Sequence, residues 1–386
     1  MMTRHGLVRG CALLLALPLS IAASAQPTRA PCTPGAVAAI AQDVIAKATA
    51  GKSEPGVTLA ISVPLRWRTP VAVASGFSDY ERRTPMRPDA RMLAGSVGKT
   101  FFGAAAFKLA QDGRLDLDRP IGRILTGIDI PGGDVVTTRM LLSHTSGYGE
   151  YDGPFMDGLI ADPLRTRILD DWVGPLRRNA PGKPGVFRYS DINYVLVAEI
   201  ISKTAGEPWQ AYIERSLLRP FGLRDTVAAL TPAPARLTAG YAGARSLFGR
   251  DAMMGGGRLI YNPQFESGGG GFVSTAPDLA RWIVRLGTGN VHGERDWRLA
   301  TTPVKPADDK GDTYGMGIHI QRTPAGTAYG HSGYIPGYIS WVRYYERPAI
   351  GIAMQTNTSD DARLPWDGYD LMDEIVGKME KVCPSA

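Results

Sequence analysis

The sequence predicts an α/β protein in which the two ends of the chain form a sheet domain and the middle forms an inserted helical domain. Strand-like alternation of apolar and polar residues recurs near both ends, whereas residues 115–265 have the pattern of loops and short helices. The 386 residues are 44% hydrophobic and 21% charged, which excludes collagen-like, coiled-coil and wholly disordered chains. We therefore expect a sheet domain of residues 26–114 and 266–386 around an inserted domain of residues 115–265.

The first elements of the sheet domain are expected before residue 115. An Ala-rich stretch over residues 34–50 has helical periodicity, and Val57–Val63 and Val71–Ser75 alternate like two antiparallel strands joined by a turn. From Ser96 to Gln111 the apolar residues again fall on one helical face, and an Asp-Gly pair ends that helix.

The middle and the end of the chain differ in kind. Short helices closed by Gly or Pro are expected in the middle, at residues 137–143, 193–204 and 209–218. Strands return near the C-terminus, at residues 314–321, 327–331, 338–345 and 349–355. A final helix is expected over residues 366–381.

Residues 1–25 have the pattern of a secretory signal peptide. Arg4 and Arg9 precede an apolar stretch from Cys11 to Ala23, and Ala23-Ser24-Ala25 is a small-x-small cleavage site. An uncleaved anchor is the alternative, but the apolar stretch is too short for a membrane span. No later segment is apolar enough to cross a bilayer, so we expect a periplasmic or secreted protein without a transmembrane segment after signal removal.

Charge and cysteine content narrow the classes of partner and cofactor. The net charge of +6 falls to +4 without Arg4 and Arg9, and no Lys/Arg run marks a nucleic-acid-binding stripe. Two cysteines, Cys32 and Cys383, remain after signal removal, and the sequence leaves open whether they are paired or unrelated. The histidines form no pair at helical spacing, and there is no C-x-x-C or H-E-x-x-H, so neither a metal nor a cofactor is predicted.

The first candidate for chemistry is the S-x-x-K motif at Ser96 and Lys99. Residues three apart at a helix start lie on one face, so the Lys amine can reach the Ser hydroxyl and accept its proton. The helix N-terminus adds backbone N–H groups that suit a developing oxyanion. A phosphate-binding loop is the alternative for this stretch, but the Gly that it requires is replaced by Leu93.

Two further motifs carry polar groups of the right kind. Tyr189-Ser190-Asp191 lies in a loop before a helix, and a phenol can relay protons when nearby cations lower its pKa. His331-Ser332-Gly333 ends a strand rich in small residues, where Gly admits close approach of a substrate and the other two offer hydrogen-bond donors. A buried Tyr with a bonded hydroxyl and a strand-end turn are the structural alternatives.

These three motifs, in this order, resemble those of the serine β-lactamases and penicillin-binding proteins, in particular the class C β-lactamase and DD-carboxypeptidase branch. Ser96–Lys99 matches S-x-x-K, Tyr189 matches the Tyr of Tyr-x-Asn, and residues 331–333 match the H-T-G form of the third motif. Residues 115–120, 141–147 and 270–275 are also similar to stretches of that family. The resemblance covers about residues 35–380.

The resemblance implies an antiparallel sheet flanked by helices, with the site between the sheet and an inserted all-helical domain. Ser96 would attack a carbonyl, with Lys99 and Tyr189 sharing the role of general base. The backbone N–H groups of Ser96 and Tyr334 would form the oxyanion hole, and His331 would help orient Tyr189 and the substrate.

The resemblance also bears on residues outside these motifs. It implies a Cys32–Cys383 disulfide, because the family fold brings the chain ends together. His144 is interpreted as structural, since its stretch has the character of a loop scaffold.

Two positions depart from the family pattern. Asp191 stands where the family has Asn, and an ionised Asp lacks the amide N–H that binds an acylamino carbonyl. Asp191 can instead pair with Lys99, accept a hydrogen bond from a substrate amine, or cap the following helix. Ser332 replaces the usual Thr and keeps the hydroxyl.

The sequence thus predicts an exported serine hydrolase acting through an acyl-enzyme on peptide, ester or β-lactam carbonyls. Its substrate would be a small molecule or derived from peptidoglycan, with substrate contacts from Asp191, His331, Ser332 and Gly333. Asp191 favours a poor β-lactamase that prefers esters or substrates with a free amine. Two alternatives remain open: an esterase, and a penicillin- or peptidoglycan-binding protein that is acylated without turnover.

Overall fold

A seven-stranded antiparallel sheet is the centre of the computed structural model, which describes residues 32–51, 55–305 and 311–383. The predicted signal peptide lies outside the described residues. The strand order is β10-β11-β12-β13-β14-β1-β2. The strands of this sheet are β1 Val57–Ser62, β2 Val71–Ser75, β10 Thr313–Tyr314, β11 His319–Thr323, β12 Gly326–Ile335, β13 Tyr338–Tyr345 and β14 Ile350–Thr356.

Short strands and helical turns complete the elements that position the site. The further strands are β3 Phe77–Asp79, β4 Thr84–Pro85, β5 Met92–Leu93, β6 Val227–Ala228, β7 Met254–Gly255, β8 Arg258–Leu259 and β9 Phe272–Ser274. The α-helices are α1 Pro34–Thr49, α2 Lys99–Gln111, α3 Thr138–Leu142, α4 Gly153–Ala161, α5 Leu169–Arg178, α6 Asp191–Ala205, α7 Trp209–Ile213, α8 Ala276–Gly287, α9 Gly293–Ala300 and α10 Gly368–Val382. The helical turns used below are η1 Gly95–Gly98 and η4 Pro263–Gly269.

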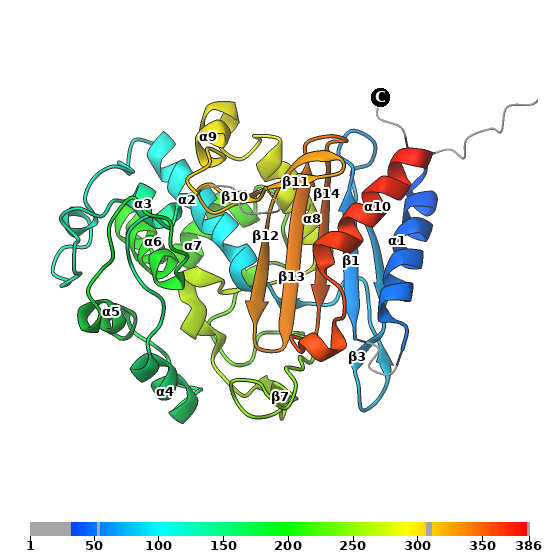
Figure 1. The fold of residues 1–386 in the computed structure, drawn as a ribbon, viewed down its shortest axis with the longest axis horizontal. Helices are drawn as coiled ribbons and strands as arrows, with labels where there is room; N and C mark the ends of the chain where they lie inside the picture. The colour runs from blue at the N-terminus through cyan, green and yellow to red at the C-terminus, as the bar shows by residue number, and fades with distance from the viewer. Residues whose placement is uncertain (1–31, 52–54, 306–310, 384–386) are drawn as a thin grey trace, which may run out of the picture.

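Helices cover both faces of the sheet (Figure 1). Helices α1 and α10 pack on one face, where Val44, Ile375 and Met354 belong to one buried cluster. Helix α8 lies against β1, β13 and β14 on the other face, and the largest core continues from there into α2 and α6. Both faces of β1 and β14 are therefore buried, which explains why most of their residues are apolar.

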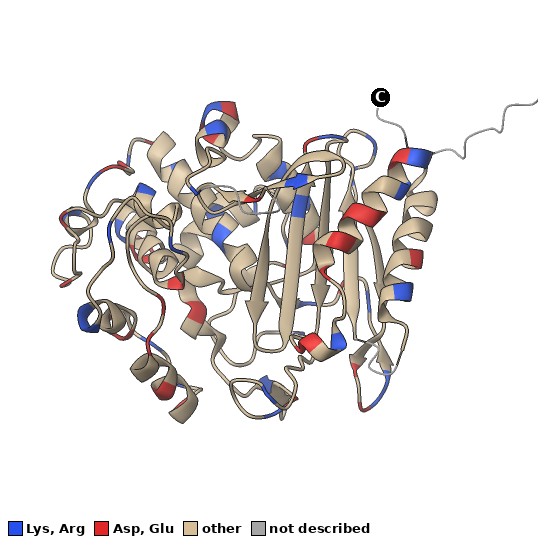
Figure 2. Ribbon diagram, viewed as in Figure 1, with Lys and Arg blue, Asp and Glu red and all other residues tan. Residues whose placement is uncertain are grey.

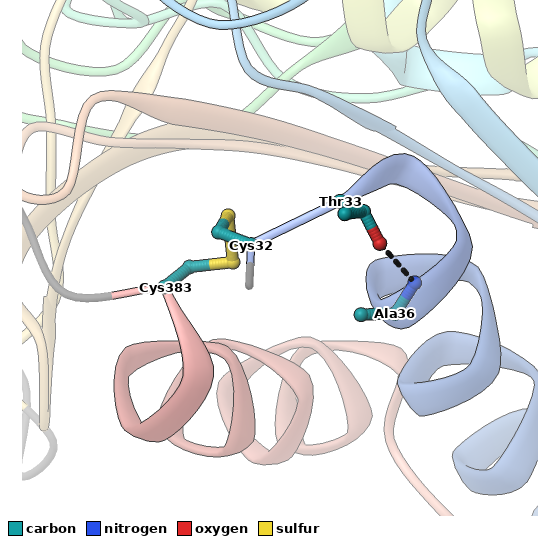
Figure 3. Close-up of a disulfide and its surroundings, with 4 residues drawn as sticks. All are labelled: Cys32, Thr33, Ala36 and Cys383. Carbon is teal, nitrogen blue, oxygen red and sulfur yellow. Dashed lines mark hydrogen bonds between the residues drawn. A yellow bond between two sulfur atoms is a disulfide. The ribbon is translucent and has the colours of Figure 1, made fainter. Parts of the chain in front are cut away.

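The predicted assembly of the sheet from both chain ends is confirmed. Strand β1 pairs with β14, with Val57 opposite Thr356, and with β2 on its other side. The chain ends meet at the start of α1 and the end of α10, where Cys32 and Cys383 form a disulfide with a Cα–Cα distance of 4.8 Å (Figure 3). Thr33 caps α1 beside this bond by accepting a hydrogen bond from the N–H of Ala36 (3.2 Å).

The structure corrects three details of the predicted elements. The segment 115–265, expected to be all-helical, contains helices α3 to α7 and also short strands. One of these strands, β6, pairs with β9, whose other neighbour in the sheet is β5. The strand expected over residues 314–321 is split into β10 and β11, because the chain turns at Gly317 with φ +78°. Strand β12 runs on to Ile335, so His331 lies inside the strand instead of at its end.

Charges of both signs are interspersed over the elements, for example along α10 (Figure 2). Where the chain is described, no helix has the length and apolar character needed to span a membrane.

Candidate active site

Ser96 and Lys99 are held by the turn that leads from β5 into α2. Gly95 opens the turn with φ +53°, and a Cβ at this position would lie 2.8 Å from the backbone nitrogen of Tyr334. Lys99 is the first residue of α2, and its Nζ donates a hydrogen bond to Ser96 Oγ at 2.8 Å. The predicted contact between the two side chains is present.

Lys99 is fully buried and bound by oxygen atoms on several sides. Besides Ser96, its Nζ donates to the carboxylate of Asp191 and to the carbonyl oxygen of Gly269 (2.6 Å). Burial on its own lowers the pKa of this amine, but the charge of Asp191 leads the interactions that outweigh burial and raise the pKa above its usual value. Lys99 is therefore protonated at neutral pH.

Tyr189 and Asp191 lie on either side of the start of α6. Ser190 is the N-cap, and Asp191 is the first helical residue, so α6 begins two residues earlier than the sequence indicated. Asp191 does not cap the helix; its carboxylate is paired with Lys99. The Lys99 ammonium lies 4.9 Å from the centre of the Tyr189 ring. Burial raises the pKa of Tyr189 to about 12, with Lys99 acting in the opposite direction.

His144 packs behind Tyr189 and fixes the start of α6. Its Nδ1 accepts a hydrogen bond from the N–H of Ser190 (3.2 Å) and lies 3.1 Å from Nδ2 of Asn193. Its ring is 4.2 Å from the ring of Tyr189, centre to centre. Burial, and then the charge of Lys99, hold the pKa of His144 well below its usual value. These contacts are those of a neutral scaffold residue, which agrees with its interpretation as structural.

The edge of β12 borders the Ser96 turn. Strand β11 pairs with β12 only as far as Gly330, so the following residues of β12 lie beside η1 instead. A Cβ on Gly333 would lie 2.1 Å from the carbonyl oxygen of Ala94 and 2.8 Å from the nitrogen of Ser96. Only Gly fits this approach, which brings the backbones carrying the N–H groups of Ser96 and Tyr334 together.

The side chains of β12 alternate between the two faces of the sheet, and this corrects the role of Ser332. Ser332 is opposite Trp341, a residue of the cluster under α1 and α10, so its hydroxyl points away from the face that bears Ser96. Only the Ser332 backbone lies at the site. His331 is on the site's face, but Nε2 lies 3.1 Å from the hydroxyl of Tyr314 and Nδ1 contacts the Ser332 carbonyl. Its contact with Tyr189 is between the two rings, whose centres are 6.3 Å apart.

Two carboxylates at the site were not found by sequence reasoning. Glu150 is an exposed residue, and its carboxylate accepts a hydrogen bond from the N–H of Asp191 (2.8 Å). Partial loss of water around the carboxyl group, followed by the charge of Asp191, raises its pKa to about 7. The carboxylates of Glu266 and Asp191 both lie next to Gly269. A Cβ atom on Gly269 would be 2.8 Å from Glu266 Oε2 and 3.3 Å from Asp191 Oδ1. Burial likewise raises the pKa of Glu266 well above its usual range.

The only signal for these groups in the sequence was the run of glycines at residues 268–271, which follows Glu266 closely. A Cβ on Gly268 would lie 1.9 Å from the carbonyl oxygen of Tyr194, so this run needs glycine to pack against α6. No comparable signal marks Glu150. Over the described part of the chain, no group of three or more His, Cys, Asp or Glu side chains is arranged to hold a metal ion.

Comparisons with known proteins match most of this chain. The family model described as "Beta-lactamase" matches residues 41–375. Putative penicillin-binding protein PbpX of Bacillus subtilis (strain 168) is 26% identical over 299 residues, which are 75% of this chain and 68% of that protein. Esterase EstB of Burkholderia gladioli is 32% identical over 165 residues, 39% of this chain and 42% of the esterase. A crystal structure of D-amino acid amidase from Ochrobactrum anthropi SV3 has the same fold, with a TM-score of 0.75 at 23% identity, covering 90% of this chain and 99% of that one.

Proposed function

Because this chain belongs to the β-lactamase family of serine hydrolases, we propose that it cleaves acyl substrates through an acyl-enzyme on Ser96. The observation that carries this proposal is the hydrogen bond from the buried Lys99 amine to Ser96 Oγ, with the Tyr189 ring against the same amine. A serine hydroxyl attacks a carbonyl only when its proton is removed, and this arrangement supplies both a proton acceptor and a cation beside it.

The charges assign different parts to Tyr189 and Lys99. Lys99 is paired with Asp191 and stays protonated. It therefore cannot accept the Ser96 proton unless it first gives up a proton of its own. Its positive charge partly offsets the burial that raises the pKa of Tyr189 to about 12, so Tyr189 acts as the base in the minor fraction of the enzyme in which its phenol has given its proton to solvent. In that form the phenolate takes the Ser96 proton as the Oγ–carbonyl bond forms. The same proton passes to the leaving group when the tetrahedral intermediate collapses.

The backbone at β12 supports the charge that develops on the carbonyl oxygen. The close approach of the two backbones that carry the N–H groups of Ser96 and Tyr334 supports an oxyanion hole formed by these two donors. Water then attacks the ester bond to Ser96, releasing the acid and restoring the hydroxyl. No cofactor is needed in either step.

The charges around Lys99 favour a substrate that carries a free amine. The charge of Asp191 raises the pKa of both Glu150 and Glu266, and Lys99 acts on both in the opposite direction. Because the pKa of Glu266 is raised and the Asp191 charge is paired with Lys99, the Glu150 carboxylate is the group that would attract an ammonium near the scissile carbonyl. The acylamino carbonyl of a β-lactam would meet the Asp191 carboxylate. An amino acid ester or amide is the simplest substrate with an amine beside the carbonyl.

The proposed function is tested with five compounds on the purified protein. These are a short-chain nitrophenyl ester, phenylalanine methyl ester of either hand, phenylalanine amide and a fluorescent penicillin. Turnover and covalent label are followed by absorbance and mass spectrometry. Turnover of the amine-bearing compounds supports the proposal, whereas a stable penicillin label without turnover of any compound identifies a penicillin-binding protein instead.

Replacing Asp191 by Asn is expected to raise cephalosporin acylation relative to hydrolysis of the simple ester by about 5- to 150-fold. The change restores an amide donor and removes a charge, which together amount to about 1–3 kcal/mol. Both rates are measured on one preparation, by stopped-flow absorbance. Asp157→Asn, at an exposed position of α4, is the matched control and should leave the ratio unchanged. An unchanged ratio in Asp191→Asn removes Asp191 from the selection of substrates.

The contribution of Glu150 to the preference for amines is expected to increase as the pH rises through about 7. The pKa of Glu150 is raised to about 7, so this carboxyl is neutral below that pH and gains its charge above it. One added charge near the surface corresponds to about a fivefold gain in kcat/KM for the amine-bearing ester. Glu150→Gln keeps an acceptor for the Asp191 N–H but cannot ionise. The ratio of kcat/KM between the wild type and Glu150→Gln is taken at each pH, so that the titration of the substrate amine cancels. A ratio that does not change with pH contradicts the role of Glu150.

A further inference from the structure

A cavity lies away from the catalytic groups, where the β3–β4 hairpin, the segment before β5 and residues 236–239 meet. Its volume is about 560 Å³. None of Ser96, Lys99, Tyr189 or His331 contributes to its lining. The lining includes three guanidinium groups, from Arg87, Arg91 and Arg236, and two carboxylates, from Asp79 and Asp89.

Most charges of this cavity are compensated within the chain. Asp89 is bound by Arg87 through two hydrogen bonds of 2.9 Å, and Asp79 is bound by Arg82. Arg236 pairs with Asp225 outside the cavity lining, at 2.8 Å.

Arg91 is the exception. Its side chain is nearly buried, with the residue 8% exposed, and it forms no ion pair with any residue of the described chain. Its Nη1 donates to the carbonyl oxygen of Ala235 (3.1 Å), while Nε is buried without an acceptor and no hydrogen bond is formed by Nη2. Asp225 and Asp278 attract this guanidinium from a distance, but neither carboxylate is bound to it. Burying a guanidinium without a bound counterion is costly, because the charge loses water and the distant carboxylates replace it only in part.

The free donor of Arg91 is of the kind that binds a carboxylate. Nε is enclosed by the protein, so Nη2 is the unpartnered donor that can reach a ligand in the cavity, and a charged N–H of this kind binds a carboxylate oxygen. We propose that this cavity is a binding site for a ligand with a single carboxylate, which Arg91 holds at its inner end.

The surroundings of Arg91 agree with one negative charge on the ligand. Burial, and next the like charge of Arg236, lower the pKa of Arg91, yet a guanidinium remains protonated under all ordinary conditions. The backbone of Arg91 is fixed as well, since its carbonyl oxygen accepts a hydrogen bond from the N–H of Thr238 (2.9 Å). The backbone position from which the Arg91 side chain extends is thus set before a ligand arrives.

The test uses titration calorimetry with N-acetylglycine and its uncharged counterpart N-acetylglycinamide as a matched pair, and inorganic phosphate as a third ligand. N-acetylglycine is expected to bind and the amide is not. Arg91→Gln should weaken binding about tenfold or more, as expected for loss of a charged hydrogen-bond donor. Arg236→Glu, at a side chain that is 72% exposed, adds a repelling charge without touching the core and should also weaken binding.

Lys99→Ala separates this cavity from the active site. Binding that survives Lys99→Ala and is lost in Arg91→Gln or Arg236→Glu supports the proposal. Binding lost in Lys99→Ala, binding unaffected by both arginine variants, or no binding of N-acetylglycine overturns it. Phosphate binding in place of N-acetylglycine likewise overturns the assignment to a carboxylate. If Arg91→Gln does not fold, binding to Arg236→Glu decides between these outcomes.

Discussion

Ser96→Ala is expected to abolish covalent labelling by a fluorophosphonate or fluorescent penicillin and to remove hydrolysis of every substrate. The hydroxyl is the atom that bonds to the acyl group, so its loss stops the reaction at the first step. Intact-protein mass spectrometry measures the label, and the thermal unfolding midpoint should change little, because Ser96 contributes one hydrogen bond with Lys99 and no core volume.

Ser246→Ala provides the matched control for this result. Ser246 lies in the loop between β6 and β7, where its hydroxyl donates to the carbonyl oxygen of Arg250. This variant should label at the wild-type rate. Label that persists in Ser96→Ala, mapped by peptide sequencing to another serine, would show that the nucleophile lies elsewhere.

Lys99→Ala and Tyr189→Phe are each expected to slow acylation by about 100-fold or more. Loss of a positioned proton acceptor has this effect, and loss of Lys99 also removes the cation that favours the Tyr189 phenolate. Lys99→Ala should in addition reduce thermal stability, because the Asp191 carboxylate loses its buried partner. Stopped-flow acylation by the nitrophenyl ester gives both rates.

Matched substitutions elsewhere separate chemistry from folding. Lys108→Ala changes a lysine near the other end of α2, and Tyr212→Phe removes a buried hydroxyl that has no hydrogen-bond partner among the described residues. Both should acylate at the wild-type rate. Near-normal acylation in Lys99→Ala and in Tyr189→Phe would remove these residues from the mechanism.

The sequence was sufficient for features that depend on local geometry. The three-residue spacing of Ser96 and Lys99 places both on one helical face, and the structure has their hydrogen bond. Strand and helix patterns at the chain ends likewise predicted the sheet that β1 and β14 share, and the family resemblance predicted the Cys32–Cys383 disulfide. The hydroxyl of Ser332 was misplaced, although strand alternation alone puts it on the face opposite His331.

Other features depend on contacts between residues far apart in the chain. The sequence left two roles open for Asp191, a helix cap and a partner of Lys99. Lys99 and Asp191 are 92 residues apart, and only the packing of α2 against α6 brings the carboxylate to the amine. Glu150 lies 41 residues before Asp191 and accepts a hydrogen bond from its N–H. The carbonyl oxygen of Gly269 binds Lys99 although the two residues are 170 positions apart.

The sequence therefore determined which groups are available for the reaction, and the tertiary structure decided their state of charge. Helical spacing and strand alternation act over a few residues and can be recognised in a single chain. Burial and the approach of one charge to another set the pKa values of Lys99, Tyr189 and Glu150, and both arise only when distant segments pack together.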